Sequence, residues 1–380
     1  MARQGGLSLL AIIFALGVNG GARGSDGVRE DISLNGKWEH VVVPAKSDNV
    51  PAEGWKEFTV PGTVWLGTEA PGKYLWLRRE VEIPDKSPGC RFFVDVRGAK
   101  YDPHVYVDGV LAGFRLEGFS PFEVEITGLV KPGGRHRIGI RCRDHGVVFS
   151  RKESSKGKFL APVGGYKNPA GPFGDILLRI RPPVRLVDRD LVIVTSTRKA
   201  TITVNGRVDG GGDGLLVDAV VLDGGKERLR IDSGRVGPGG EWTIAKAFPD
   251  ARCWSPEAPH LYHLGISLRR GGDLVDAQTI RFGFKEIWTE GPDFYLNGVK
   301  RHLLASSTWP VTQPQSDEEI RRNLETMRAG NVCTFRLHTE PWPARWLDIA
   351  DEVGVMIVDE AAVYTATGSY AYSDRGFWET

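Results

Sequence analysis

The stretch that decides the fold reads FRLHTEPWPARWLDIADEVGVMIVDEAA and runs from Phe335 to Ala362. Its middle is a helical segment that enters through prolines at about Pro343, continues to Val353 and ends at Gly354. Proline at the start of a helix and glycine just past its end are typical boundaries. The following run VGVMIVDE is typical of a strand buried on both faces. The stretch therefore predicts a strand, a helix and another strand of a parallel sheet.

A similar unit lies just upstream. In QSDEEIRRNLETMRAGN, Ser316 and Glu319 form a capping box and Gly330 ends the helix. One face of this helix carries the apolar residues Ile320, Leu324 and Met327. We expect a strand at 332–337 after the helix and a buried strand at 301–305 before it. Three strands with two helices between them predict the opening of a repeating β/α fold.

Two architectures continue such a unit, an open doubly wound sheet or a closed eight-fold (β/α)8 TIM barrel. A dinucleotide-binding sheet carries Gly-x-Gly-x-x-Gly after its first strand, whereas here Ala305 leads into SSTWP, which favours the barrel. Polar groups at the carboxyl ends of barrel strands face the active site. Those ends carry Ser306, Ser307, Trp309, Arg336, His338, Asp359 and Glu360. A barrel needs about 250 residues, so we expect this chain to be the N-terminal part of a longer protein.

The preceding residues predict two antiparallel β domains. Short alternating runs between Ile32 and Arg181 predict a jelly-roll sandwich, and Asp108-Gly109 predicts a hairpin turn. Strand-like runs between Pro182 and Phe284 suit an immunoglobulin-like sandwich. The glycine-rich run at 208–214 lacks the helix and the Lys-Ser/Thr of a phosphate loop, so a flexible hairpin turn is the better interpretation. The predicted domains are 26–182, 183–285 and 286–380.

The first 25 residues resemble a secretory signal. Arg3 precedes an apolar stretch and small residues follow it, which predicts cleavage after Ala22 or Gly24 and export to the periplasm or the extracellular space. The stretch is too short to be a stable membrane span, so no membrane insertion is expected after cleavage. The 4 cysteines have no CxxC spacing, so no zinc site is indicated. Whether Cys90 and Cys142 pair stays open.

The amino-acid composition limits the classes of molecule that the chain is expected to bind. Lys+Arg 49 nearly balances Asp+Glu 48, so the chain has no net basic charge for binding nucleic acid or an acidic membrane. The 11 tryptophans suit β-domain cores and also surfaces that stack on sugar rings. Neutral small molecules are the favoured ligands, and no cofactor motif is present.

Several motifs, in order, resemble glycoside hydrolase family 2, which contains β-galactosidases, β-glucuronidases and β-mannosidases. VYVDGVLAGFRLEGFSPFEVEIT and AGPFGDILL resemble its sugar-binding jelly roll, and CWSPEAPHLYHLGISL resembles the signature of its immunoglobulin-like domain. RFGFKEI with FYLNGVK resembles the join into the barrel. EIRRNLETMRAGNVCTFRLHTEP and DIADEVGVMIVDEA resemble the barrel from its first helix to its third strand. The resemblance covers nearly all of the chain after the signal.

The resemblance implies a glycosidase that hydrolyses O-glycosyl bonds of β-linked sugars by a retaining mechanism. One glutamate protonates the departing oxygen while a second attacks the anomeric carbon from about 5 Å away. In the family these glutamates follow the fourth and seventh barrel strands, and the first of them belongs to an Asn-Glu pair. No Asn-Glu pair occurs in this sequence. The catalytic glutamates are therefore expected beyond Thr380, and the chain alone is expected to be inactive.

The resemblance also implies roles for residues that are present. Arg336 matches an arginine that hydrogen-bonds the nucleophile and keeps it ionised, with a structural salt bridge as the alternative. His338 resembles a pocket histidine, although the family pattern is Arg-x-x-His and this chain has Arg-Leu-His. Asp359 and Glu360 match the family's Asp-Glu after the third strand, where they either contact sugar or brace the strand ends. Further substrate-pocket candidates are Trp309, Asn168 and Tyr166.

The family pattern is incomplete in two places. LLASSTWP replaces the usual Gly-Val-Asn-Arg-His, and APVGGYKNPAG lacks an aspartate common in galactoside and glucuronide enzymes. The sugar and linkage stay open, no metal ligand is assigned, and homo-oligomers are common in the family. The alternative function is a non-catalytic carbohydrate-binding or scaffold protein of two β domains. An open sheet edge, which a stable protein tends to avoid, favours the enzyme fragment.

Overall fold

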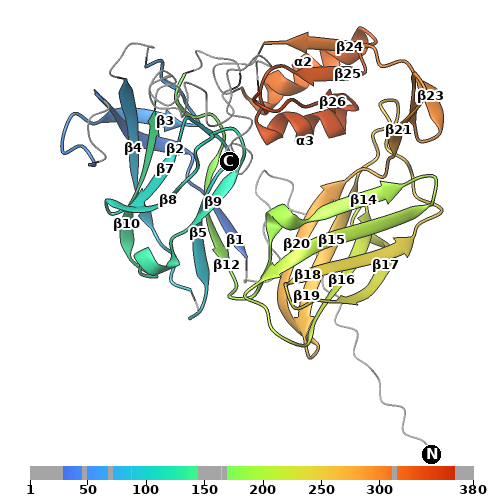
Figure 1. The fold of residues 1–380 in the computed structure, drawn as a ribbon, viewed down its shortest axis with the longest axis horizontal. Coiled ribbons are helices and arrows are strands. Elements are labelled where there is room, and N and C mark those ends of the chain that lie inside the picture. Colours follow the sequence, from blue (N-terminus) through green and yellow to red (C-terminus); the bar gives the residue numbers. More distant parts are fainter. Residues whose placement is uncertain are drawn as a thin grey trace, which may run out of the picture.

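The computed structural model describes residues 29–44, 49–66, 72–86, 88–143, 164, 169–309 and 315–363. These residues form two β-sandwiches and a segment of parallel strands and helices, which confirms the predicted architecture (Figure 1). The predicted signal at 1–25 and the candidates Tyr166 and Asn168 lie outside the described residues.

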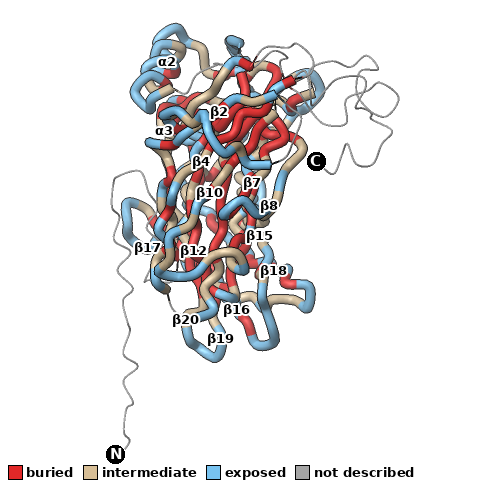
Figure 2. Tube along the Cα trace, turned by 90° about the vertical axis from the view of Figure 1, so that its left-hand side faces the viewer, coloured by how far each residue is buried: buried red, intermediate tan, exposed pale blue. Residues whose placement is uncertain are grey.

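The first sandwich consists of a four-stranded and a six-stranded antiparallel sheet. The smaller sheet has the order β1 (Glu30–Ser33), β12 (Ile176–Arg181), β5 (Arg91–Val96) and β9 (Phe122–Glu125). The larger has the order β3 (Lys56–Val60), β2 (Gly36–Pro44), β4 (Lys73–Glu82), β10 (Arg135–Arg143), β7 (His104–Val107) and β8 (Val110–Phe114). Short strands β6 (Ala99–Lys100) and β11 (Gly171–Pro172) pair beside them. The core lies between the sheets, where alternate residues such as Leu75, Leu77, Ile138 and Ile140 are fully buried. Figure 2 shows buried positions along β4 and β10.

The predicted hairpin turn of the first sandwich is confirmed. Val107 of β7 pairs with Val110 of β8, and Asp108 and Gly109 between them have φ of 48° and 86°. Both values lie in the left-handed region that a type I′ turn requires.

The second sandwich packs two four-stranded antiparallel sheets. One contains β13 (Arg185–Leu186), β14 (Val192–Ser196), β15 (Thr201–Asp209) and β18 (Glu241–Ala247). The other has the order β17 (Lys226–Arg235), β16 (Leu215–Asp223), β19 (Tyr262–Arg270) and β20 (Asp273–Phe282). The prediction of a hairpin turn at the glycine-rich run 208–214 is wrong, because β15 and β16 belong to different sheets. The run crosses between the sheets, and a Cβ on Gly210 would lie 2.2 Å from the Pro183 carbonyl oxygen.

The third segment begins with a three-stranded antiparallel sheet of β21 (Ile287–Glu290), β22 (Asp293–Leu296) and β23 (Val299–Arg301). A parallel sheet with the order β24 (Ala305–Thr308), β25 (Thr334–Leu337) and β26 (Met356–Val358) follows. Helices α2 (Asp317–Ala329) and α3 (Ala344–Val353) connect these parallel strands. In Figure 1 this segment lies above the second sandwich and beside the first.

Both helices match their predicted signals. The Ser316 side chain accepts from the Glu319 N–H, and the Glu319 side chain accepts from the Ser316 N–H, so the capping box is present. Gly354 ends α3 at φ 84°, and a Cβ there would lie 2.5 Å from the Pro256 carbonyl oxygen of the second sandwich. Glycine is thus required at this position both by its backbone angle and by the close contact.

Two strand predictions are wrong in position or burial. The predicted buried strand at 301–305 forms instead at Ala305–Thr308, because the Leu304 N–H donates to the His302 carbonyl oxygen in a tight turn before it. All residues of the observed strand are exposed. The predicted doubly buried strand is only the short β26, whose residue Val358 is 46% exposed. β24 and β26 are both edges of the described sheet, so neither has neighbours on two sides.

Buried charges join the two sandwiches. The guanidinium of Arg29 donates to Asp276 of β20, to Asp188 and to the Leu186 carbonyl. Arg179 and Arg181 of β12 also donate to Asp188. This network links the two sandwiches, and removing one of its partners would leave a buried charge uncompensated.

The pairing of Cys90 with Cys142, which the sequence left open, is absent. The cysteines Cys90, Cys142, Cys253 and Cys333 are all unpaired. Within the described ranges, no helix has the length and apolar character needed to cross a membrane.

Candidate functional site

The carboxyl ends of β24, β25 and β26 bring several predicted residues together. Parallel pairing sets Thr308 beside Leu337 and Arg336 beside Val358. Trp309 and His338 follow directly after β24 and β25, and Glu360 follows shortly after β26. The structure therefore gathers Trp309, Arg336, His338 and Glu360 into one strand-end cluster.

Arg336 and Glu360 form the charged centre of this cluster. Arg336 Nε donates to Glu360 Oε1, and the two side chains are 44% and 24% exposed. Partial burial acts to raise the pKa of Glu360, but hydrogen bonds from Arg336 and Thr339 and the Arg336 charge outweigh it and lower the pKa. Glu360 is thus held as a carboxylate.

Thr339 supplies the second hydrogen bond to Glu360. Its backbone N–H donates to Glu360 Oε2 at 2.6 Å. Thr339 has φ 65°, a left-handed angle that is unusual for a β-branched residue and costs on the order of 1–3 kcal/mol. Such an angle persists only where neighbouring contacts fix it. No motif in the sequence pointed to this role of Thr339.

Trp309 and His338 form the less polar side of the cluster. Their rings meet edge to face with centroids 4.5 Å apart, and Trp309 is 67% exposed. His338 Nδ1 lies 4.0 Å from Glu360 Oε2 and makes no hydrogen bond to any described residue. The exposed indole ring offers an apolar face on which a sugar can stack, whereas His338 Nδ1 is buried beside Glu360.

Asp359 does not join the cluster through its side chain. It is exposed, and its carboxylate accepts from the backbone N–H of Glu360 at 3.1 Å. Although the residue as a whole is exposed, nearby protein atoms displace part of the water around the carboxylate. This desolvation and the Glu360 charge raise the pKa of Asp359 more than the hydrogen bond from the Glu360 N–H lowers it. Asp359 and Glu360 therefore do not form a facing pair of carboxylates of the kind that glycoside hydrolysis uses.

The first sandwich contributes a residue that sequence reasoning missed. Lys100 Nζ of β6 donates to Glu340 Oε1, and the two side chains are only 7% and 4% exposed. Glu340 directly follows Thr339. The residues are far apart in the sequence and belong to no shared motif, so only the folded chain reveals their contact.

A second contact from the first sandwich reaches the loop after β26. The Gly164 N–H donates to the Ala362 carbonyl oxygen at 2.6 Å. A Cβ on Gly164 would lie 2.5 Å from Glu340 Oε2. The first sandwich therefore contacts the loops after β25 and β26, two of the three strand ends that carry the cluster.

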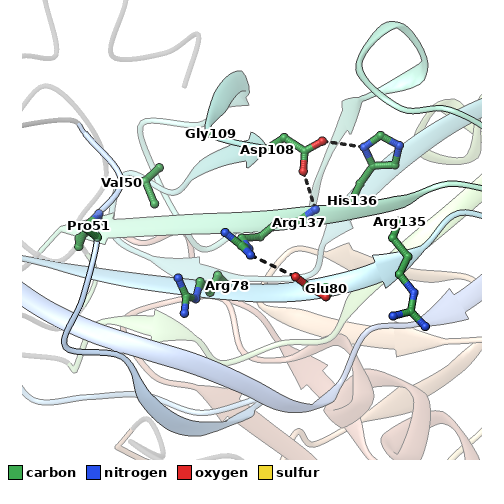
Figure 3. A pocket seen from close by; sticks show the side chains of 10 residues that line it. Val50, Pro51, Arg78, Glu80, Asp108, Gly109, Arg135, His136 and Arg137 are labelled. Atoms are coloured by element: carbon green, nitrogen blue, oxygen red, sulfur yellow. Dashed lines mark hydrogen bonds and ion pairs between the residues drawn. The ribbon is translucent and has the colours of Figure 1, made fainter.

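A hollow of about 460 Å³ on the outer face of the six-stranded sheet contains none of the predicted site residues (Figure 3). It is lined by Val50, Pro51, Ala52, Arg78, Glu80, Asp108, Gly109, Arg135, His136 and Arg137. Much of its charge is paired, since Arg137 donates to Glu80 at 3.1 Å and His136 Nδ1 lies 2.7 Å from Asp108. In the part of the chain that the structure describes, no group of His, Cys, Asp and Glu could hold a metal ion.

Two family models match the second half of the chain. A family model described as glycosyl hydrolases family 2 matches residues 189–285. A second, described as glycosyl hydrolases family 2, TIM barrel domain, matches residues 280–374. The latter range includes every member of the strand-end cluster.

Curated relatives are similar over most of the chain. The β-galactosidase large subunit of Leuconostoc lactis is 23% identical over 76% of this chain and 45% of its own length. A β-glucuronidase of Paenibacillus borealis is 23% identical over 79% of this chain and 52% of its own length. The chain thus spans about half the length of these relatives.

Solved structures share the fold. The β-glucuronidase of Bifidobacterium dentium, complexed with coumarin-3-O-glucuronide, matches with a TM-score of 0.73 and 19% identity, covering 89% of this chain and 62% of its own. A family 2 member from Bacteroides cellulosilyticus matches with a TM-score of 0.71 and 16% identity, covering 87% of this chain and 47% of its own.

Proposed function

Because the chain belongs to glycosyl hydrolases family 2, we propose that it is the N-terminal part of an exported glycosidase that acts on a β-linked sugar. The observation that carries the proposal is the strand-end cluster, which lies where barrel enzymes bind substrate. The described sheet has three parallel strands and two open edges, and the matched part is only about half of the length of the relatives. Both facts support a barrel completed by residues beyond Thr380.

The proposed chemistry divides between this chain and those further residues. A retaining glycosidase needs an acid and a nucleophile about 5 Å apart, and the cluster offers no such pair. Arg336 would bind a carboxylate and keep it ionised, as it already does for Glu360. Trp309 would stack on the sugar, and His338 would hydrogen-bond it through Nε2, since Nδ1 is buried. The two catalytic glutamates would come from later strands.

Ligand binding by the chain tests this assignment. We expect titration with aryl β-glycosides, followed by calorimetry, to show weak binding that Trp309→Ala abolishes. Phe114→Ala is the matched control, because Phe114 is an aromatic residue of similar exposure on β8 of the first sandwich. Equal loss of binding in both variants, or binding unaffected by Trp309→Ala, would contradict the proposed pocket.

The alternative is a non-catalytic carbohydrate-binding protein. Turnover does not distinguish the two functions, since both predict an inactive 380-residue chain. Robust hydrolysis of an aryl β-glycoside by the pure chain would contradict both. Export is tested separately by the intact mass of secreted protein, which should lack about the first 22 to 24 residues if the signal is cleaved.

A further inference from the structure

A buried ion pair joins the first sandwich to the strand-end loops. Lys100 and Glu340 are both more than nine-tenths buried, and each belongs to a different part of the fold. Burying two charges has a desolvation cost that their attraction offsets only in good geometry. A buried ion pair is weak evidence that it stabilises the fold. What the pair does is therefore better inferred from the parts of the chain that it joins.

The backbone around Lys100 is tightly fixed. Lys100 pairs with Gly171 in the β6–β11 ladder, and the Ala99 N–H donates to the Gly118 carbonyl oxygen at 2.8 Å. A Cβ on Gly118 would lie 1.9 Å from the Ala99 carbonyl oxygen, so only glycine fits there. The Lys100 ammonium also lies 4.9 Å from the ring centre of Phe173. The position of Lys100 is therefore fixed by the first sandwich.

Glu340 links Lys100 to the strand-end cluster. It directly follows Thr339, whose left-handed backbone aims its N–H at Glu360 Oε2. Glu360 in turn accepts from Arg336. A continuous chain of contacts thus runs from Lys100 through Glu340 and Thr339 to the central ion pair.

We propose that Lys100 is a positioning residue for the strand-end site. By holding Glu340, it keeps Thr339 in its left-handed conformation and Glu360 in the orientation that pairs with Arg336. The first sandwich then shapes the site through Lys100, although Lys100 itself does not contact the ligand. Its importance for glycoside binding rests on the proposed function, whereas the positioning itself does not.

The amide of Thr339 provides a direct readout. In the chain labelled with 15N-threonine, its resonance is assigned by its disappearance in Thr339→Ser. A short hydrogen bond to a carboxylate should place this amide proton downfield and protect it from exchange. In Lys100→Met we expect the resonance to move upfield and exchange to accelerate at least tenfold. Lys246→Met is the control, since Lys246 pairs with Asp232 on the exposed surface of the second sandwich and should leave the resonance unchanged.

A second variant keeps the test decisive if Lys100→Met fails to fold. Lys100→Met with Glu340→Gln removes both charges of the pair, and we again expect the Thr339 resonance to move. An unmoved resonance in either folded variant, accompanied by a lower Tm, would overturn the proposal and leave Lys100 a purely structural residue.

Ligand binding separates this proposal from the proposed function. We expect Lys100→Met to weaken aryl β-glycoside binding about tenfold, and Lys246→Met to leave it unchanged. If the unmodified chain binds no β-glycoside, the proposed function fails while the resonance test still decides the positioning role. If the glycoside binds with equal affinity to Lys100→Met and to the unmodified chain, positioning of the site is contradicted.

Discussion

Asp188 is the residue at which charge contributes most clearly to stability. Burial acts to raise its pKa, but the charges of Arg29, Arg181 and Arg179 lower it to about 2. An unfolded aspartate has a pKa of about 3.9. The carboxylate therefore stabilises the fold fully above about pH 4, and this contribution of about 2 kcal/mol is lost as the pH falls towards 2.

We predict that Asp188→Asn removes this pH dependence. Between pH 5 and pH 2, the free energy of unfolding of the unmodified chain should fall by about 2 kcal/mol more than that of Asp188→Asn. Urea unfolding at a series of pH values measures the difference. Asp213→Asn, at an exposed position of the glycine-rich run, should behave like the unmodified chain. Parallel curves for all three proteins would contradict the prediction.

Residues of the site were predictable only where a motif places them at a strand end. Trp309, Arg336, His338 and Glu360 follow from the parallel β/α pattern, because such strands align their carboxyl ends. Lys100, Glu340 and Thr339 did not follow from it. Their roles depend on tertiary contact between separate parts of the chain and on one backbone angle, neither of which leaves a local sequence pattern.

At the scale of elements, helix α2 offers a simple test of a sequence signal. Ser316 accepts a hydrogen bond from the Glu319 N–H at 3.3 Å and so satisfies a donor of the first turn. We expect Ser316→Ala to reduce the free energy of unfolding by about 1 kcal/mol and to accelerate amide exchange in the first turn of α2. Ser233→Ala, on the exposed side of β17, is the control. Unchanged exchange in α2 would contradict the capping role.

Element prediction succeeded where local chemistry determines the outcome. The Asp108-Gly109 turn and the ends of α3 were correct because left-handed angles and helix caps depend on nearby residues. The glycine-rich run at 208–214 was misassigned because a hairpin and a crossover between sheets need the same turn residues. Strand β24 was misplaced because the apolar sequence near Leu304 suggested burial, whereas the strand is an exposed edge.

At the scale of the whole molecule, the parallel sheet is unfinished among the described residues. All four residues of β24 are exposed, and the neighbouring Leu304 is 58% exposed. Exposed edge strands with adjacent apolar groups tend to pair with other chains. We predict that the chain associates with rising concentration, as measured by sedimentation velocity.

A charge at this edge should reduce the association. We expect Leu304→Lys to keep the chain monomeric at concentrations where the unmodified chain associates. Leu216→Lys, on β16 within a sheet of the second sandwich, is the matched control and should not change the association. A monomer at every concentration, or equal suppression by both substitutions, would show that the open sheet is not the associating surface.

The most direct test of the central claim is to sequence the gene past the codon for Thr380. We predict that the reading frame continues for roughly 150 residues or more, with an Asn-Glu pair after the next strand and a further glutamate at a later strand end, as a complete barrel with two catalytic carboxylates requires. A stop codon directly after Thr380 would contradict the assignment to a glycosidase and would leave carbohydrate binding as the function to test.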